Sequence, residues 1–155
     1  MNYWLMKSEP DVYSIDHLAR EPKKTDHWDG IRNYQARNFM RDDMKKGDLA
    51  FFYHSSCDEP GIAGVIEIVK EGYPDDTAFD PHEKYFDAKS DPANPRWVMV
   101  NVKLKKKFKK VITLKNLREE TKLKNMRLLQ KGNRLSIMPV EKKEWDHIVN
   151  IAESQ

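Results

Sequence analysis

Residues 97–108 carry the sequence pattern that most constrains how this chain can fold. Five apolar side chains share one parity of the residue numbers, and polar side chains occupy most positions of the other parity. The first set is Val98, Val100, Val102, Leu104 and Phe108, and the second is Asn101, Lys103, Lys105 and Lys107. Because successive side chains of a β-strand point to opposite faces, this alternation predicts a long strand with one face in a core and the other in water.

Shorter patterns predict the other elements. Aromatic and β-branched residues bounded by turn formers indicate strands. Apolar positions at helical spacing, with Ser14 and Asn33 as caps, indicate helices. The predicted strands span residues 2–7, 49–54, 61–70 and 135–140, and the predicted helices span residues 14–19, 33–44, 113–120 and 125–130, with a terminal helix around Trp145, Ile148, Val149 and Ala152.

The order of these elements decides the fold class. Strands and helices do not alternate regularly, which argues against a doubly wound parallel sheet. Residues 49–54 and 61–70 predict a hairpin, whereas residues 72–95 are long and aromatic enough to form an ordered excursion over one end of the sheet. A chain of 155 residues has the length of about one domain. We therefore predict a single α+β domain over residues 1–155, with a curled sheet or open β-barrel and short flanking helices.

Charge and cysteine content exclude several classes of protein. The chain has 28 Lys and Arg against 25 Asp and Glu, a net charge of +3 that permits a polyanionic partner without requiring one. A single cysteine, Cys57, excludes a disulfide framework, and its pairing with His54 in a metal or thiol site has no further ligand at suitable spacing. No segment approaches the roughly 20 apolar residues of a membrane span. We expect a soluble, cytoplasmic monomer without metal or cofactor.

The lysine-rich run at residues 103–110 has two interpretations. It is explained by a solvated strand face, because the apolar positions continue through it. Contact with phosphate would instead add affinity without any choice of sequence. Lys105 and Lys107 are the candidates for such contact.

Several segments combine a planar ring or guanidinium with small hydrogen-bonding groups at the ends of predicted elements. They are residues 4–9, 28–34, 54–56, 96–97 and 133–136. Side chains from distant segments converge at such ends, and this mixture can stack on a flat heteroaromatic ligand and read its edge. Core packing remains the simpler explanation of each tryptophan taken alone.

Three of the longest motifs are YWLMKSEP at residues 3–10, WDGIRNYQARN at residues 28–38 and FFYHSSC at residues 51–57. They closely resemble the EVE domain family, and the likeness continues in order through residues 60–64, 73–75, 79–81, 95–97 and 134–136. The resemblance implies a PUA-like fold, a curled β-barrel with flanking helices that is similar to YTH domains. It further implies a non-catalytic reader of a modified cytosine or adenine in DNA or RNA, taken out of its stack.

The resemblance also implies which residues surround the base. The expected base pocket consists of Lys7, Ser8, Glu9, Trp28, Arg32, Asn33, His54, Ser55, Ser56, Trp97, Leu135 and Ser136. Trp28 or Trp97 is the expected stacking wall, and Asn33 and Ser55 are the expected readers of the base edge. Phosphate contacts are expected from Lys7, Arg32, Arg37, Arg134, Lys105 and Lys107.

Other functions remain open at this point. ASCH domains, a similar PUA-like family, include amidohydrolases that act on acylated nucleobases such as N4-acetylcytidine. Lys7, Ser8 and Glu67 could supply their lysine, hydroxyl and carboxylate, although adjacent strand residues point to opposite faces. The further alternatives are a general RNA-binding protein and a fold retained for protein–protein contact with an unused pocket.

Overall fold

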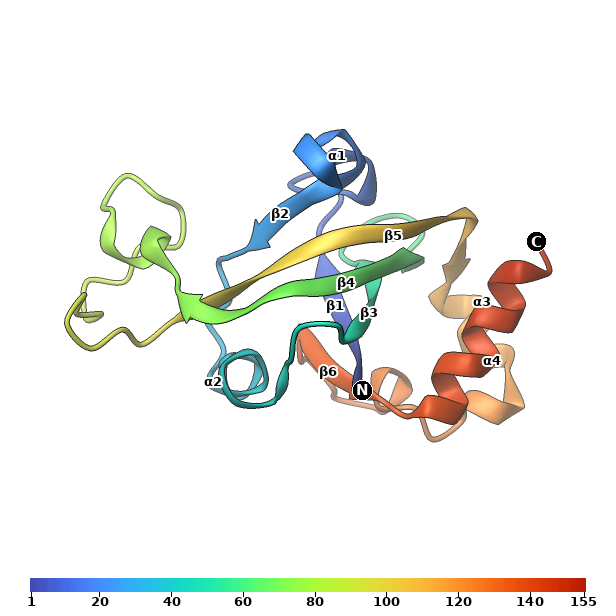
Figure 1. The fold of residues 1–155 in the computed structure, drawn as a ribbon. Helices are drawn as coiled ribbons and strands as arrows, with labels where there is room; N and C mark the ends of the chain where they lie inside the picture. Colours follow the sequence, from blue (N-terminus) through green and yellow to red (C-terminus); the bar gives the residue numbers. More distant parts are fainter.

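The computed structural model describes residues 1–155, in which short helices surround one six-stranded sheet (Figure 1). The strands are β1 (Tyr3–Ser8), β2 (Thr25–Trp28), β3 (Leu49–His54), β4 (Gly61–Pro74), β5 (Val98–Thr113) and β6 (Ile137–Val140). The α-helices are α1 (Ile15–Arg20), α2 (Tyr34–Asn38), α3 (Leu114–Glu119) and α4 (Lys142–Glu153). None of the helices is both long and apolar enough to cross a membrane.

The sheet is mixed and open. Its strand order is β2-β5-β4-β3-β1-β6, so that β2 and β6 form the two edges. β1 pairs with β3 in parallel, and every other neighbouring pair is antiparallel. The predicted long strand and the predicted hairpin are both present, as β5 and as β3–β4. Several register shifts interrupt the β4–β5 pairing, and such irregularities bend and twist a sheet.

Each face of the sheet packs against its own hydrophobic core. Trp4 and Phe52 belong to the core on the side of α1 and α2, whereas Leu5 and Phe51 belong to the core on the side of α3 and α4. β5 contributes to both cores, because its register shifts and twist turn one set of alternate residues from the first core into the second. Val98, Val100 and Val102 lie in the first core, and Phe108 and Ile112 lie in the second.

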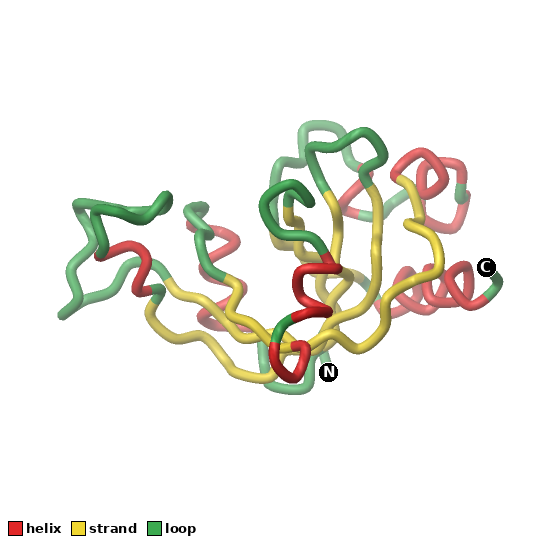
Figure 2. Tube along the Cα trace, turned by 90° about the horizontal axis from the view of Figure 1, so that it is seen from above, coloured by secondary structure: helices red, strands yellow, loops and turns green.

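A long loop, residues 75–97, joins β4 to β5; we call it the β4–β5 loop. Figures 1 and 2 show it projecting beyond one end of the long β4–β5 pair, while α3 and α4 lie at the other end. The base of the loop is closed by a hydrogen bond from the Asp75 amide to the Trp97 carbonyl at 2.9 Å. The expected ordered excursion is therefore present, and two of its residues, Lys84 and Tyr85, lie near the end of β2.

Some elements differ from those that the sequence predicts. β2 was not predicted, because it has only four residues and only Trp28 among them is buried. Asn33 caps α2 as expected, accepting from the Ala36 amide at 2.9 Å, but the helix ends at Asn38 and a π-helical turn follows at Phe39–Asp43. The predicted helix at residues 125–130 contains only a short 3₁₀ turn at Arg127–Leu129.

Candidate functional site

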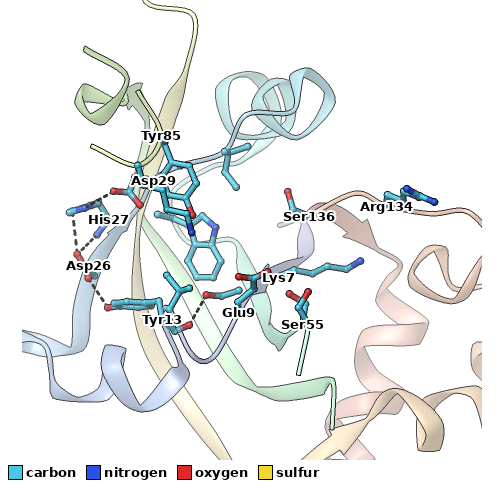
Figure 3. A pocket seen from close by; sticks show the side chains of 17 residues that line it. Lys7, Glu9, Tyr13, Asp26, His27, Asp29, Ser55, Tyr85, Arg134 and Ser136 are labelled. Atoms are coloured by element: carbon cyan, nitrogen blue, oxygen red, sulfur yellow. Dashed lines mark hydrogen bonds and ion pairs between the residues drawn. The ribbon is translucent and has the colours of Figure 1, made fainter. Parts of the chain in front are cut away.

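A cavity of about 690 Å³ opens where the C-terminal ends of β1, β2 and β3 come near one another (Figure 3). Its volume lies within the range of about 300–1,000 Å³ that is typical of small-ligand sites. It is lined by Lys7, Ser8, Glu9, Val12, Tyr13, Asp26, His27, Trp28, Asp29, Gly30, Ile31, Ser55, Ser56, Lys84, Tyr85, Arg134 and Ser136.

The parallel pairing of β1 with β3 explains why distant segments converge there. Because the two strands run in the same direction, their C-terminal ends lie side by side, and Ser8 pairs with His54. The Ser55 amide continues the ladder by donating to the Ser8 carbonyl at 3.0 Å. On the other side of β1, the Lys7 amide donates to the Ser136 carbonyl at 2.8 Å. Residues from three separate parts of the sequence therefore share one wall of the cavity.

Three aromatic rings line the cavity: Tyr13, Trp28 and Tyr85. Trp28 ends β2, is only 7% exposed, and packs edge-on against Phe52 with ring centres 5.3 Å apart. Tyr85 comes from the β4–β5 loop and reaches the cavity from the side of β2. Trp28 is anchored in the hydrophobic core, whereas Tyr85 depends on how its loop is held.

Three carboxyl groups also line the cavity: Glu9, Asp26 and Asp29. Asp26 is engaged within the protein, because it accepts a hydrogen bond from the Tyr13 hydroxyl at 2.6 Å. Burial raises the pKa of Tyr13, and the bond to Asp26 raises it further. Burial likewise raises the pKa of Asp29, whose carboxylate lies 3.3 Å from the His27 Nε2.

Lys7, Lys84 and Arg134 bring positive charge to the same cavity. Lys7 is half-buried at the end of β1, and burial lowers the pKa of its ammonium group. Figure 3 shows Lys7, Glu9 and Ser55 on one side of the cavity, facing Tyr85 and Asp29 on the other. The cavity thus offers rings, hydrogen-bond acceptors and cations to a single ligand.

Comparison with known protein families identifies the family of this chain. The model of the EVE domain matches residues 2–151. The chain belongs to the EVE domain family. Its mixed six-stranded sheet, which is not closed, agrees with the predicted PUA-like α+β fold.

Three relatives of this EVE domain are informative. Human thymocyte nuclear protein 1 is 44% identical over 99% of this chain and 75% of the human protein. A crystal structure of human THYN1 in complex with DNA containing 5-methylcytosine is similar with a TM-score of 0.92 and 45% identity, covering 100% of this chain and 99% of that chain. A hypothetical protein from Leishmania major has a TM-score of 0.94 and 44% identity, covering 100% of this chain and 96% of its own.

The structure brings many of the predicted site residues of this EVE domain onto the cavity. Those from the predicted base pocket are Lys7, Ser8, Glu9, Trp28, Ser55, Ser56 and Ser136, and Arg134 from the predicted phosphate contacts joins them. They come from four separate segments, as the expectation of convergence at strand ends requires. Their roles toward a ligand stay predictions.

Five predicted pocket residues do not line the cavity: Arg32, Asn33, His54, Trp97 and Leu135. Asn33 is the cap of α2, and Leu135 packs against the core on the side of α3 and α4. The His54 Nε2 accepts a hydrogen bond from the Ile15 amide at 3.1 Å, at the start of α1. Asn33, His54 and Leu135 lie one or two positions from lining residues in the sequence, which is why a motif alone does not separate them from those residues.

Trp97 is likewise part of the scaffold and does not line the cavity. It is 5% exposed, it stacks on Tyr34 with ring centres 4.9 Å apart, and its Nε1 donates to Asp87 at 2.7 Å. These contacts bury Trp97 outside the two cores, whereas the other candidate wall, Trp28, does reach the cavity.

Three predicted phosphate contacts also lie off the cavity. Arg37 donates to the Arg96 carbonyl at 3.0 Å, and its guanidinium lies over the rings of Tyr34 in α2 and Trp97. Lys105 forms an ion pair with Glu67 at 3.6 Å, and Lys107 pairs with Asp16. Both lysines are about half exposed, which is the solvated strand face that the alternation of β5 predicts.

Lys7 and Glu67, two of the residues considered for an amidohydrolase site, do not lie close together. Lys7 pairs with Tyr53 of β3, whereas Glu67 pairs with Leu49, four residues earlier in the same strand. At about 3.3 Å per residue, this separates the backbone positions by about 13 Å along the sheet. Glu67 does not line the cavity and instead faces Lys105.

Sequence reasoning missed nine lining residues. They are Val12, Tyr13, Asp26, His27, Asp29, Gly30, Ile31, Lys84 and Tyr85. Asp29, Gly30 and Ile31 belong to the motif at residues 28–38, so a signal was present for them. Lys84 and Tyr85 lie in the β4–β5 loop, and no local pattern indicates that this loop returns to the cavity.

Proposed function

We propose that this EVE domain binds DNA containing 5-methylcytosine and receives the modified base, turned out of its stack, in the cavity at the ends of β1, β2 and β3. One observation carries the proposal. A single cavity combines aromatic rings with carboxyl groups and cations, in a chain that is 45% identical to a human protein crystallised with DNA containing 5-methylcytosine. This similarity to a DNA-bound relative also supports a binding domain in preference to an enzyme.

Asp29 is the candidate reader of the base edge. Cytosine presents an N4 amino group that donates hydrogen bonds, and carboxylates are suited to accept them. Thymine has an O4 acceptor at the same position, which a carboxylate would repel. Asp29 is held in the cavity with its pKa raised by burial, so that an amino donor would compensate for water that the carboxylate has lost.

The magnitudes show what each part of the cavity has to supply. Turning a base out of the stack costs a few kcal/mol, and stacking on a ring returns about 1–3 kcal/mol. Burying one methyl group adds about 0.8 kcal/mol, which is about a fourfold preference for the methylated base. Val12 and Ile31 offer apolar surface in the cavity for such a group. A preference for 5-methylcytosine over cytosine greater than fourfold has to come from the fit between the base and the shape of the cavity.

The cations at the cavity have a separate role in the proposal. Lys7, Lys84 and Arg134 line the site proposed to accept a neutral base, and we assign them to the phosphates that flank it. Contacts with phosphate position the DNA and add affinity that falls with salt, but they do not distinguish one base from another. Base selectivity and salt dependence are therefore separable in an experiment.

A binding titration tests the proposal. The purified chain is titrated with DNA and RNA oligonucleotides of one sequence, single- and double-stranded, each with cytosine or 5-methylcytosine at one position, at two salt concentrations. We expect tighter binding to the methylated DNA, with a ratio that persists at the higher salt concentration. Equal affinity for methylated and unmethylated DNA would refute the proposal.

Asp29→Asn supplies the matched variant, because it keeps the shape of the side chain and replaces one acceptor oxygen by a donor. We expect it to lose preference for cytosine over thymine at the tested position while keeping the salt dependence of the wild type. An Asp29→Asn variant with unchanged preference would remove Asp29 from the proposed edge-reading role.

Other expectations from the sequence stay predictions. Binding to RNA, binding of a modified adenine, likeness to YTH domains and a monomeric state are among them. The human relative is named thymocyte nuclear protein 1, and the cytoplasmic location expected from the sequence also stays a prediction.

A further inference from the structure

Arg32 uses its entire guanidinium group inside the protein. Its Nε donates to the Tyr85 carbonyl at 2.9 Å, and one terminal nitrogen donates to the same carbonyl at 2.7 Å and to the Thr77 hydroxyl at 3.3 Å. The other terminal nitrogen donates to the Ile31 carbonyl and to Asp75, each at 3.0 Å. An arginine side chain has five N–H donors, so none of them remains for a phosphate.

Asp75 is the buried partner that completes this arrangement. Its side chain is 0% exposed, and it accepts from the Gly30 amide, from Arg32 and from the amide and hydroxyl of Thr77. Burial by itself would raise the pKa of Asp75, but these hydrogen bonds hold it below its ordinary value. The charged pair thus ties the segment after β2 to the beginning of the β4–β5 loop.

Gly30 fixes where the Tyr85 ring lies. It has a φ of +76°, and a Cβ atom at this position would come within 2.5 Å of two carbons of the Tyr85 ring. Only glycine leaves this space free, so the ring packs directly on the backbone of Gly30. Arg32 holds the Tyr85 carbonyl at the same time, and the two contacts together determine how the ring enters the cavity.

We propose that Arg32 and Gly30 are positioning residues that hold Tyr85 as the stacking wall of the base-binding cavity, and that Arg32 does not contact phosphate. This inference rests on the proposed function, because it assigns the ring on which the base stacks. Trp28 lies mostly within the core, whereas Tyr85 reaches the cavity from a loop whose position these contacts fix.

Arg32→Gln and Arg32→Lys distinguish positioning from phosphate contact. Lysine keeps the positive charge opposite Asp75, but as a point charge it cannot hold the Tyr85 carbonyl with a two-pronged contact. Both variants should therefore weaken binding of methylated duplex DNA by about 5- to 150-fold, the range expected for a lost stacking contact. Neither should change the salt dependence. A phosphate contact would instead leave Arg32→Lys close to wild type and lower the salt slope of Arg32→Gln by about 0.9.

Double variants test whether Arg32 and Gly30 act through Tyr85. Tyr85→Ala should weaken binding by a similar factor, and adding Arg32→Lys or Gly30→Ala to it should cause little further loss. Gly47→Ala is the matched control for Gly30→Ala, since Gly47 has a φ of +96° and nothing lies within 4 Å of an added Cβ atom. It should bind DNA like the wild type. Additive effects in the double variants, or wild-type affinity of Tyr85→Ala, would overturn the inference.

A measurement without DNA separates this inference from the proposed function. In glycine a hydrogen takes the place of Cβ, so one Hα of Gly30 points at the Tyr85 ring and its NMR signal carries a ring-current shift. We expect Tyr85→Ala to remove this shift and Arg32→Lys to reduce it, while Gly47→Ala leaves it unchanged. An unchanged shift in Arg32→Lys refutes the positioning role. Absence of wild-type DNA binding, with the expected shifts observed, would refute the stacking role together with the proposed function.

Discussion

A His54 substitution tests whether this residue stabilises the fold or binds the ligand. Its sequence motif predicts ligand binding, whereas its contacts predict a contribution to the stability of the fold. Its Nε2 accepts from the Ile15 amide, and its ring meets Phe52 edge-on with ring centres 5.5 Å apart. His54→Ala removes both contacts. Leaving a buried donor unpaired costs about 1–3 kcal/mol, and an aromatic pair contributes about 0.5–1.5 kcal/mol. Since the bond is only partly buried, we expect a loss in the lower half of the sum, about 1.5–3 kcal/mol.

The pH dependence of stability follows from the same hydrogen bond. Only neutral histidine can accept from the Ile15 amide, and burial lowers the pKa of His54 below its unfolded value of about 6.5. Between these two pKa values the unfolded chain binds more protons than the folded chain. His54 therefore makes stability fall as the pH drops below about 6.5, and it leaves stability unaffected above that pH. His54→Gln keeps an acceptor without this titration.

Urea unfolding, followed by tryptophan fluorescence at about pH 7.5 and about pH 5.5, measures both effects against the wild type. His54→Gln should recover most of the stability that His54→Ala loses, and it should lose less stability at the lower pH than the wild type does. Both variants should keep the DNA affinity of the wild type under conditions where they are folded. Wild-type stability of His54→Ala, or weaker DNA binding by a fully folded variant, would refute the scaffold role.

Three further predictions concern the cavity and the charges around it. Trp28→Ala should lower the free energy of unfolding by about 3–5 kcal/mol, because it opens a void in the core, whereas Trp28→Phe should cost less; equal thermal stability of both variants would contradict this. Arg134→Ala should lower the salt slope of duplex binding by about 0.9 without changing the preference for methylated DNA, as measured by titrations at several salt concentrations. The double variant Lys105→Ala, Lys107→Ala should change that slope by less than about 0.9, because both lysines lie off the cavity in ion pairs; a decrease near 1.8 would place DNA across β5.

Local patterns in the sequence predict much of this fold. The alternation in residues 97–108 predicts β5 because the side-chain period of a strand is two, whatever the strand pairs with. Ser14 and Asn33 predict the beginnings of α1 and α2, because a capping side chain bonds to an amide only a few residues away. The short strand β2 escaped prediction, since only Trp28 of its four residues is buried and no apolar alternation results.

The candidate site was predictable only in part. Residues 7–9, 28 and 55–56 could be named because rings and small polar groups lie at the ends of predicted strands and helices, in motifs that resemble the EVE domain family. Trp97 and Arg32 have the same chemical character and also lie at the ends of predicted elements. Their partners, Asp87 and Tyr34 for Trp97 and Asp75 for Arg32, become visible only in the folded chain.

The sequence by itself therefore determined the class of the fold, its family and most of its regular elements, because each depends on the order and spacing of residues along the chain. The tertiary structure alone decided which rings face the cavity and which arginine donors remain free. Those properties depend on contacts between residues far apart in sequence, such as Arg32 with the Tyr85 carbonyl, 53 positions away. No local period or motif encodes such a contact, since it forms only when β2 is paired with β5 and the β4–β5 loop is in place.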